Sequence, residues 1–419
     1  MDIKAEILST GDEVRTGAIV DSNSAYLAEK LEEAGVEVTR HNCVGDDLKQ
    51  LSTILKEIGS RADVAVVTGG LGPTVDDITA DAAADAAGVE LVRNADAVKS
   101  METIFSARHQ QISASNQKQA MLPEGATCIT NPVGTAPGFI LTIDRCTFFF
   151  LAGVPREMQR LLADAVLPAI ADLQGDARRF YKVRNISTFG LAEAACGDSL
   201  DGLNEQFPSV TLGLRAKFPE IYVKLYAQGD DMDQLDRDLA EATRWVQDRL
   251  GINVLSTEGH PIEVAVGNLL LEKKATIAIA ESCTGGLISH KITSIPGASA
   301  YFLFSGVTYA NQAKIDVLGV APETIAEYGS VHEITAKEMA EGARQRSGAT
   351  YGLATSGIAG PDGGTDEKPV GTICFGLATP EGARGFRYQQ NFGSRAANME
   401  IFAMSALDIL RRELLGFPR

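Results

Sequence analysis

The segment 281–286, ESCTGG, gathers small nucleophilic side chains at one point of the chain. An apolar, strand-like run over 276–280 ends there, and an amphipathic helical pattern begins near Leu287. The pattern predicts a strand, a tight turn and a helix start, with Ser282 in the turn. Backbone N–H groups at a helix start have no intrahelical partners, so they can hydrogen-bond the oxyanion that develops when a hydroxyl attacks a carbonyl.

The local sequence leaves two interpretations of this turn open. Gly285 and Gly286 let the backbone and a substrate approach closely, which suits a nucleophile site. Ser282 and Thr284 are also residue types that routinely cap helix N-termini through their side-chain oxygens. Taken alone, the turn is either a site for Ser282 as nucleophile or a capped helix start.

A serine nucleophile needs a base, and the sequence offers one further along. His290 lies eight residues after Ser282, about two helical turns away, so no local Ser-His arrangement is visible. The segment 309–314, YANQAK, supplies Tyr309 and Lys314. A lysine in a partly apolar pocket has a lowered pKa and acts as a neutral amine, and a tyrosine can relay or orient the proton. Taken alone, one lysine and one tyrosine in a loop are usually solvated.

A glycine-rich loop, 356–365 (SGIAGPDGGT), follows a predicted strand, Tyr351–Thr355. The loop is long for a structural turn, which favours contact with a ligand. We expect Ser356 to be a hydrogen-bond donor close to the reacting group. The loop glycines expected to contact substrate are Gly357, Gly360, Gly363 and Gly364.

Three loops in the first third of the chain combine acids, glycines and hydroxyls: 9–23, 45–47 and 68–79. The third, TGGLGPTVDDIT, has backbone amides that could cradle a phosphate, and Asp76 and Asp77 could hold a cation that bridges phosphate oxygens. A plain turn, and an acid that stabilises a helix start, are the alternatives for each loop alone. Convergence at one sheet edge favours a functional site. The loop 131–138, NPVGTAPG, is expected to close the same pocket.

The elements around these loops predict an α/β protein. Strand patterns at 4–9, 36–41 and 63–68 alternate with helical patterns at 23–34 and 47–58, which predicts a parallel, doubly wound sheet with ligands at its carboxyl edge. A polar segment, Gln174–Arg179, is the expected boundary. The next elements are a strand over 180–187, one helix over 191–207, strands over 209–217 and 220–228 and a helix over 230–249, which predict a small α+β domain. The expected domains are 1–174, 178–250 and 256–419.

Composition narrows the possible functions. A net charge of −17 and a pI near 4.8 argue against a broad nucleic-acid surface. Six scattered cysteines and five scattered histidines fit neither a disulfide framework nor a zinc site, so any metal would be held by carboxylates and ligand phosphates. The sequence shows no membrane span and no signal-peptide pattern at its start, from which we expect a cytoplasmic protein without a membrane partner.

The chain resembles full-length CinA proteins over nearly all of its length. The motifs that carry the resemblance are TGGLGPTVDDIT and NPVGTAPG in the first third, and AESCTGG, GVTYANQAK and TSGIAGPDGGT in the last. The resemblance implies a first domain similar to the molybdopterin-binding fold, which in some members hydrolyses ADP-ribose with a divalent metal. It implies a KH-like middle domain, for which we expect no RNA role here. It also implies a homodimer, with the small nucleotides NMN and ADP-ribose as the other partners.

The last domain is similar to nicotinamide mononucleotide (NMN) deamidases, which hydrolyse the NMN carboxamide to nicotinic acid mononucleotide and ammonia without a metal cofactor. Carried onto this sequence, the nucleophile is Ser282, activated by Tyr309 and Lys314. Ser356 stands where the family usually has threonine, which keeps the hydroxyl. Cys283 is the rival nucleophile, because a helix N-terminus would lower its pKa.

The resemblance also assigns the pocket of the first domain. It implies a diphosphate against the 69–74 loop and a divalent metal near Asp76 and Asp77. If one ligand is lost, the domain would be a molybdopterin- or nucleotide-binding module without turnover, and a competence-related interaction protein is the remaining alternative. The expected pocket residues are Gly69, Gly70, Thr74, Asp12, Asn23 and Asp46.

Overall fold

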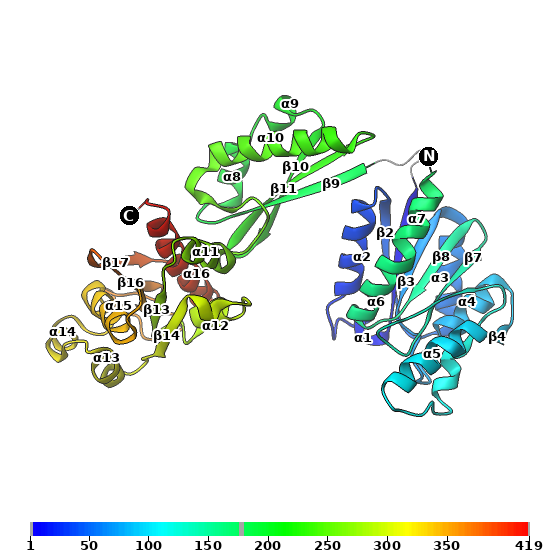
Figure 1. The fold of residues 1–419 in the computed structure, drawn as a ribbon, viewed down its shortest axis with the longest axis horizontal. Coiled ribbons are helices and arrows are strands. Elements are labelled where there is room, and N and C mark those ends of the chain that lie inside the picture. The colour runs from blue at the N-terminus through cyan, green and yellow to red at the C-terminus, as the bar shows by residue number, and fades with distance from the viewer. Residues whose placement is uncertain (1–2, 176–179, 418–419) are drawn as a thin grey trace. The chain divides into compact units, whose positions relative to one another are not determined.

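The computed structural model describes residues 3–175 and 180–417. Its contacts divide the chain into two compact units, the first comprising Met1–Val183 with Ala227–Asp236 and the second Arg184–Tyr226 with Arg237–Arg419. Figure 1 shows the elements of each unit. Residues 176–179 of the predicted boundary segment lie outside the described residues.

The first unit contains a six-stranded sheet in the order β2-β1-β3-β8-β7-β6. The first four strands of that order are parallel, and β7 and β6 are antiparallel. All five residues of β3 are buried, which its sequence VAVVT allows. The strands are β1 (Lys4–Thr10), β2 (Glu37–Val44), β3 (Val64–Thr68), β6 (Thr127–Ile129), β7 (Gly138–Ile143) and β8 (Cys146–Leu151), with β4 (Leu91–Arg93) and β5 (Met121–Pro123) as a separate pair.

Side-chain caps fix the starts of the helices that connect these strands. Asp21 accepts a hydrogen bond from the Ser24 amide at 2.9 Å, and Asp47 accepts one from the Gln50 amide at 2.9 Å. The helices are α1 (Asp12–Arg15), α2 (Ser22–Glu33), α3 (Leu48–Arg61), α4 (Thr79–Ala87), α5 (Ala95–Ala107), α6 (Pro155–Leu161) and α7 (Leu167–Gln174), with a 3-10 turn at Asn116–Ala120 and a π-helical turn at Leu162–Val166.

The middle of the chain forms a four-stranded sheet, β10-β11-β9-β12. The helix expected over 191–207 is two short helices: the first ends at Ser199, and Gly202 adopts a left-handed conformation (φ 84°) at the N-cap of the second. The elements are β9 (Phe180–Thr188), α8 (Glu193–Ser199), α9 (Leu203–Gln206), β10 (Val210–Lys217), β11 (Glu220–Gly229), α10 (Met232–Leu250) and β12 (Val254–Ser256).

The last sheet has the order β14-β13-β15-β16-β17. Its first three strands are parallel, and β16 and β17 are antiparallel. The strands are β13 (Ile277–Glu281), β14 (Phe302–Val307), β15 (Tyr351–Gly357), β16 (Thr372–Thr379) and β17 (Gly382–Gln389). The helices are α11 (Ile262–Glu272), α12 (Leu287–Thr293), α13 (Asn311–Leu318), α14 (Pro322–Tyr328), α15 (Glu333–Ser347) and α16 (Arg395–Leu414).

Successive side chains of β13 point to opposite faces of the sheet and pack in two different hydrophobic clusters. Ile277 and Ile279 belong to the cluster that contains α11, α12 and α16, whereas Ala278 and Ala280 belong to the cluster that contains α15. The second interface is very tight, because a Cβ atom added at Gly352 or Gly376 would lie 2.1 or 1.9 Å from carbonyl oxygens of α15. One at Gly342 of α15 would lie 1.8 Å from the carbonyl oxygen of Leu318 at the end of α13.

The predicted α/β class is confirmed, and two further local differences concern the segments that carry the expected site residues. The helix expected near Asp76 begins at Thr79, because the Asp77 carboxylate accepts hydrogen bonds from the Thr74 amide and hydroxyl at 2.8 and 2.5 Å and holds that segment in a turn. Lys314, expected in a loop, lies in the first turn of α13. Among the described residues, no helix is long and apolar enough to cross a membrane.

Candidate functional sites

The side chains of Ser282 and Lys314 meet at the carboxyl end of β13. The Lys314 Nζ lies 3.2 Å from the Ser282 Oγ, and both residues are buried, at 1% and 8% exposure for Lys314 and Ser282. The same Nζ donates to the backbone carbonyl oxygens of Thr308 and Tyr309 at 2.8 and 2.9 Å. The fold thus brings together the hydroxyl and the amine that the sequence separates by 32 residues.

Burial lowers the pKa of Lys314, and only a weak effect of Cys283 opposes it. No carboxylate is ion-paired with this amine within the described part of the chain. A neutral amine has two N–H groups and one lone pair. In this neutral form, the two carbonyls can take both N–H groups, so that the lone pair faces the Ser282 hydroxyl.

Glu281 determines which backbone amides of the turn remain available. Its carboxylate is fully buried and accepts hydrogen bonds from the amides of Gly286, Ile288 and Ser289 at 3.0, 3.1 and 2.9 Å. It also accepts one from the Ser289 hydroxyl at 2.5 Å. The helix-start amides that the sequence offered for an oxyanion are therefore occupied.

Two other amides of the turn are better candidates for oxyanion donors. The amide of Thr284 has no hydrogen-bond partner among the described residues, and that of Cys283 contacts only its own thiol, whereas that of Ser282 bonds the Thr355 carbonyl and that of Gly285 the Ser282 carbonyl. The N-cap residue of α12 is Gly286, and the side chain that accepts from the first amides of this helix is Glu281, so neither Ser282 nor Thr284 has the capping role that was the alternative.

The rival nucleophile, Cys283, points to the opposite core. Its side chain is 4% exposed and packs in the cluster with α12 and α16. Burial raises the pKa of the Cys283 thiol to about 12, so the expected lowering by a helix N-terminus does not occur. A thiol in this state is a poor nucleophile at neutral pH.

Tyr309 was expected to activate Ser282 together with Lys314, but its side chain makes other contacts. Its backbone carbonyl bonds Lys314, while its side chain is 60% exposed and its hydroxyl accepts a hydrogen bond from Arg395 at 3.3 Å. Arg395, at the start of α16, also donates to the Gly360 carbonyl at 2.8 Å. Arg395 therefore ties Tyr309 to the glycine-rich loop.

Ser356 and Thr355 occupy opposite faces of β15 beside the Ser282 turn. The Ser356 hydroxyl donates to the Ser330 carbonyl at 2.6 Å, which leaves its oxygen free to accept rather than donate. Thr355 pairs with Glu281 in the parallel register, and its hydroxyl lies 2.8 Å from that of Thr284. The Thr284 side chain is thus held within the structure.

The four loop glycines divide into an anchored and an exposed half. Asn398 of α16 donates to the Ala359 carbonyl at 3.0 Å, so residues 357–360 are fixed by α16 from within. Gly357 approaches β16 closely, because a Cβ there would lie 2.6 Å from the Thr372 carbonyl oxygen. Gly363 and Gly364 are exposed. Gly285 and Gly286 adopt left-handed conformations with φ of 63° and 100°, which a side chain would strain.

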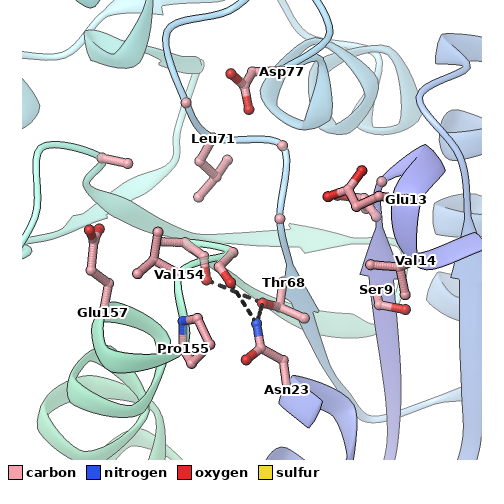
Figure 2. Close-up of a pocket in the computed structure, with 18 of the residues that line it drawn as sticks. Ser9, Glu13, Val14, Asn23, Thr68, Leu71, Asp77, Val154, Pro155 and Glu157 are labelled. Atoms are coloured by element: carbon pink, nitrogen blue, oxygen red, sulfur yellow. Dashed lines mark hydrogen bonds between the residues drawn. The ribbon is translucent and has the colours of Figure 1, made fainter. Parts of the chain in front are cut away.

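A cavity of about 570 Å³ lies at the carboxyl edge of the first sheet. Figure 2 shows Glu13 and Glu157 on different sides of it, with Asp77 on a third. Of the expected pocket residues, Asn23, Asp46, Gly69, Gly70, Asp76 and Asp77 line the cavity. Asp12 and Thr74 do not line it: Asp12 pairs with Arg15, and Thr74 bonds Asp77.

Polar contacts shape this cavity around the end of β3. The Asn23 amide nitrogen donates to the Thr68 hydroxyl at 3.1 Å and the Gly153 carbonyl at 2.8 Å (Figure 2). Its carbonyl oxygen is buried without a partner among the described residues. Gly69 and Gly70 adopt left-handed conformations and approach Thr10 and Thr79 so closely that no Cβ would fit. The backbone at these two positions is therefore packed directly against Thr10 and Thr79, and a side chain at either position would displace the loop that lines the cavity.

Carboxylates crowd one wall of the cavity. Burial and the neighbouring charges of Asp12, Glu13 and Asp76 raise the pKa of Asp46, although the Asp12 amide donates to Asp46 at 3.1 Å. A hydrogen bond from Thr74 lowers the pKa of Asp76. No group of three or more acid, histidine or cysteine side chains within the described ranges is arranged to hold a metal ion. The oxygen donors suit a hard divalent cation that takes its remaining ligands from a bound phosphate and water.

The sequence analysis gave no role to several residues of these sites. Glu281 was visible as an acid just before the nucleophile, but its bonds to the next helix depend on the turn. Arg395 and Asn398 lie far from Ser282 in sequence and had no local signal. Glu157 begins a helix after the end of β8, so its place at the carboxyl edge of the sheet could have been inferred.

Family models match three consecutive parts of the chain. A "Probable molybdopterin binding domain" matches residues 6–172, a "Damage-inducible protein CinA KH domain" residues 183–255, and a "CinA C-terminal domain" residues 259–414. Among solved structures, the competence/damage inducible protein CihA from Agrobacterium tumefaciens is 37% identical, covering 36% of this chain and 91% of that one, with a TM-score of 0.35.

Curated relatives match the chain from end to end. A CinA-like protein of Desulfosudis oleivorans is 52% identical over 98% of this chain and 100% of its own length. One of Desulforapulum autotrophicum is 46% identical over 99% of each. These matches confirm the resemblance seen in the sequence motifs, and the chain belongs to the CinA family.

Proposed function

We propose that the last domain is an amidohydrolase that converts NMN and water to nicotinic acid mononucleotide and ammonia. The observation that carries this proposal is the buried contact between the Lys314 amine and the Ser282 hydroxyl, without a carboxylate to hold the amine protonated. Amide hydrolysis needs a nucleophile, a base and oxyanion donors. Ser282, Lys314 and the amides of Cys283 and Thr284 supply one set of these groups without a metal.

The proposed reaction has two halves. The Ser282 oxygen attacks the carboxamide carbon while the Lys314 amine takes the hydroxyl proton, and the amides of Cys283 and Thr284 stabilise the oxyanion. The C–N bond then breaks, and Lys314 gives its proton to the departing ammonia. Water, deprotonated by the same amine, hydrolyses the resulting ester and restores Ser282. Arg395 adds a positive charge at this edge, which suits the phosphate of a mononucleotide.

Ammonia release from NMN tests this activity directly. The full chain should release one ammonia for each NMN consumed, without added metal and in the presence of a chelator. Ser282→Ala should lower the rate by about 10³-fold or more, because the ester intermediate cannot form. Ser294→Ala, which removes an exposed hydroxyl just after the end of α12 and away from the reacting groups, is the control. Normal ammonia release by Ser282→Ala would contradict the mechanism.

A second function is favoured by the cavity of the first unit. We propose that this cavity binds ADP-ribose, with the diphosphate against the peptide groups of 69–72 and a divalent cation near Asp76, Asp77 and Asp46. The volume of about 570 Å³ and the crowded carboxylates support this proposal. The cation would offset the negative charges of phosphate and carboxylates, while the protein residues hold and orient the ligand.

Titration with ADP-ribose, with and without Mg²⁺ or Mn²⁺, separates hydrolysis from binding. We expect metal-dependent binding and formation of AMP. Gly72→Ala, whose Cβ would lie 2.4 Å from an Asp77 carboxylate oxygen, should weaken binding by at least about 10-fold while ammonia release from NMN stays unchanged. Binding without AMP would instead identify a nucleotide-binding module. Absence of both activities would leave an interaction protein as the leading account.

A further inference from the structure

A second, smaller cavity of about 200 Å³ lies beside the glycine-rich loop of the first unit. It shares Gly70, Leu71, Gly72, Asp77 and Gln119 with the larger cavity, so this loop borders both. The larger cavity falls within the range of about 300–1,000 Å³ that is usual for ligand sites, and the smaller one is below it. The side cavity is therefore sized for one part of a ligand whose remainder lies in the larger cavity.

The lining of the side cavity has the character of a ring-binding site. Most of its walls are apolar, and they come from the start of α4, from β4 and from β5. The apolar lining residues are Leu71, Ala80, Leu91, Met121, Leu122 and Pro137. Apolar walls of this kind pack against the faces of a flat heterocycle, while polar groups at the edge select it.

Asp81 is the polar residue of the side cavity whose side chain has an unsatisfied hydrogen-bond acceptor. It lies in the first turn of α4 and lines the side cavity, yet its Oδ2 atom is buried without a hydrogen-bond partner among the described residues. A buried carboxylate oxygen without a donor is costly, and such groups in folded proteins usually have a partner. In this cavity the missing donor would be an N–H group of the ligand.

Lys118 lines the same cavity and supplies the complementary charge. Its amine donates to the Thr74 carbonyl at 3.3 Å, on the loop that separates the two cavities. One carboxylate and one amine match an edge that presents a donor beside an acceptor, as the exocyclic amino group and neighbouring ring nitrogen of adenine do. Gln119 is less available, because its side chain bonds the Leu71 carbonyl at 3.3 Å.

We propose that this side cavity is a base subsite in which Asp81 accepts a hydrogen bond from the exocyclic amino group of an adenine ring whose diphosphate lies in the larger cavity. This subsite rests on the proposed binding of ADP-ribose by the first unit and specifies how that ligand is selected. Asp81 is then a specificity residue that contacts the base and takes no part in bond breaking.

Equilibrium titrations with two ligands test the subsite. ADP-ribose carries the amino group, and its hypoxanthine analogue carries a carbonyl oxygen in the same place. The wild-type chain should bind ADP-ribose about 10- to 100-fold more tightly, the effect of one hydrogen bond to a charged group. Asp81→Ala should reduce this ratio to about 2 or less. Asp81→Asn, whose amide can donate to the carbonyl oxygen, should shift the ratio toward the hypoxanthine analogue.

The controls separate a failed subsite from a failed site or a damaged fold. Glu124→Gln, an exposed acid that lines neither cavity, should bind both ligands like the wild type. Unchanged ammonia release from NMN reports that each variant is folded in its last domain, and a wild-type thermal transition reports on the first. Equal binding of both ligands by the wild type would overturn the subsite alone. Binding of neither would overturn the proposed nucleotide site and the subsite with it.

Discussion

Replacement of Lys314 by alanine is expected to lower the rate of NMN deamidation by about 10³-fold or more, because no other base in the described part of the chain contacts the Ser282 hydroxyl. Lys314→Arg keeps the positive charge but cannot give a neutral base, so it should be equally inactive. Lys273→Ala, which removes an exposed lysine from the same domain, should retain full activity. Activity in Lys314→Arg would show that charge, not basicity, is required.

The pH dependence follows from the lowered pKa of Lys314. Only the neutral amine accepts a proton, so kcat/KM of the wild type should fall as pH decreases through this pKa. Stability has the same sign: between the lowered folded pKa and the ordinary value of 10.5, the unfolded chain binds more protons, so the free energy of unfolding rises with pH. Lys314→Met should lose this slope. A wild-type rate that stays flat toward acid pH would contradict a neutral amine base.

Replacement of Glu281 by alanine is expected to cost about 2–4 kcal/mol of stability and most of the activity. The change leaves three backbone amides, one of them fully buried, and the Ser289 hydroxyl without their shared acceptor. The turn that carries Ser282 and the amides of Cys283 and Thr284 would lose its anchor. Chemical denaturation and single-turnover kinetics measure the two effects.

Conservative variants distinguish positioning by Glu281 from a general loss of structure. Glu281→Gln keeps one acceptor oxygen but turns an NH₂ group toward the amides, so it should lower kcat more than it raises KM, with a smaller loss of stability. Ser289→Ala removes only one of the four donors and should change stability by about 1 kcal/mol. If Glu281→Gln is stable and fully active, the amides of the turn do not depend on this carboxylate.

The sequence predicted the sheets and the nucleophile turn because their signals are local. The run over 276–280 and the paired glycines define β13 and its turn within a few residues. The local sequence did not predict the helix that carries Lys314, because residues 311–318 include too few core-facing side chains to show a helical pattern. The contact between Lys314 and Ser282 also depends on β14, a strand that the hydrophobic pattern of the sequence did not predict.

The sequence-based expectation for the first cavity differs from the structure at Asp12 and Thr74, whose side chains bond neighbouring residues and do not line the cavity. Thr74 and Asp77 form a turn of their own, and Asp12 is held by Arg15. Sequence spacing places all of these residues near one sheet edge but says nothing about which carboxylate is already engaged. Glu281 illustrates the same limit in the last domain, since its four bonds exist only once strand, turn and helix are together.

The glycines that bring α15 against its neighbours have a consequence for how this protein could diversify. Gly352, Gly376 and Gly342 set the spacing of α15 from the strands and from α13 by direct backbone contact. The distance between the side chains of Ser282 and Lys314 therefore depends on direct backbone contacts. The larger side chains of the other core can be substituted without altering that distance. Substitutions in the exposed half of the 356–365 loop can change substrate preference. A single methyl group added at any of the three glycines would abolish the proposed reaction.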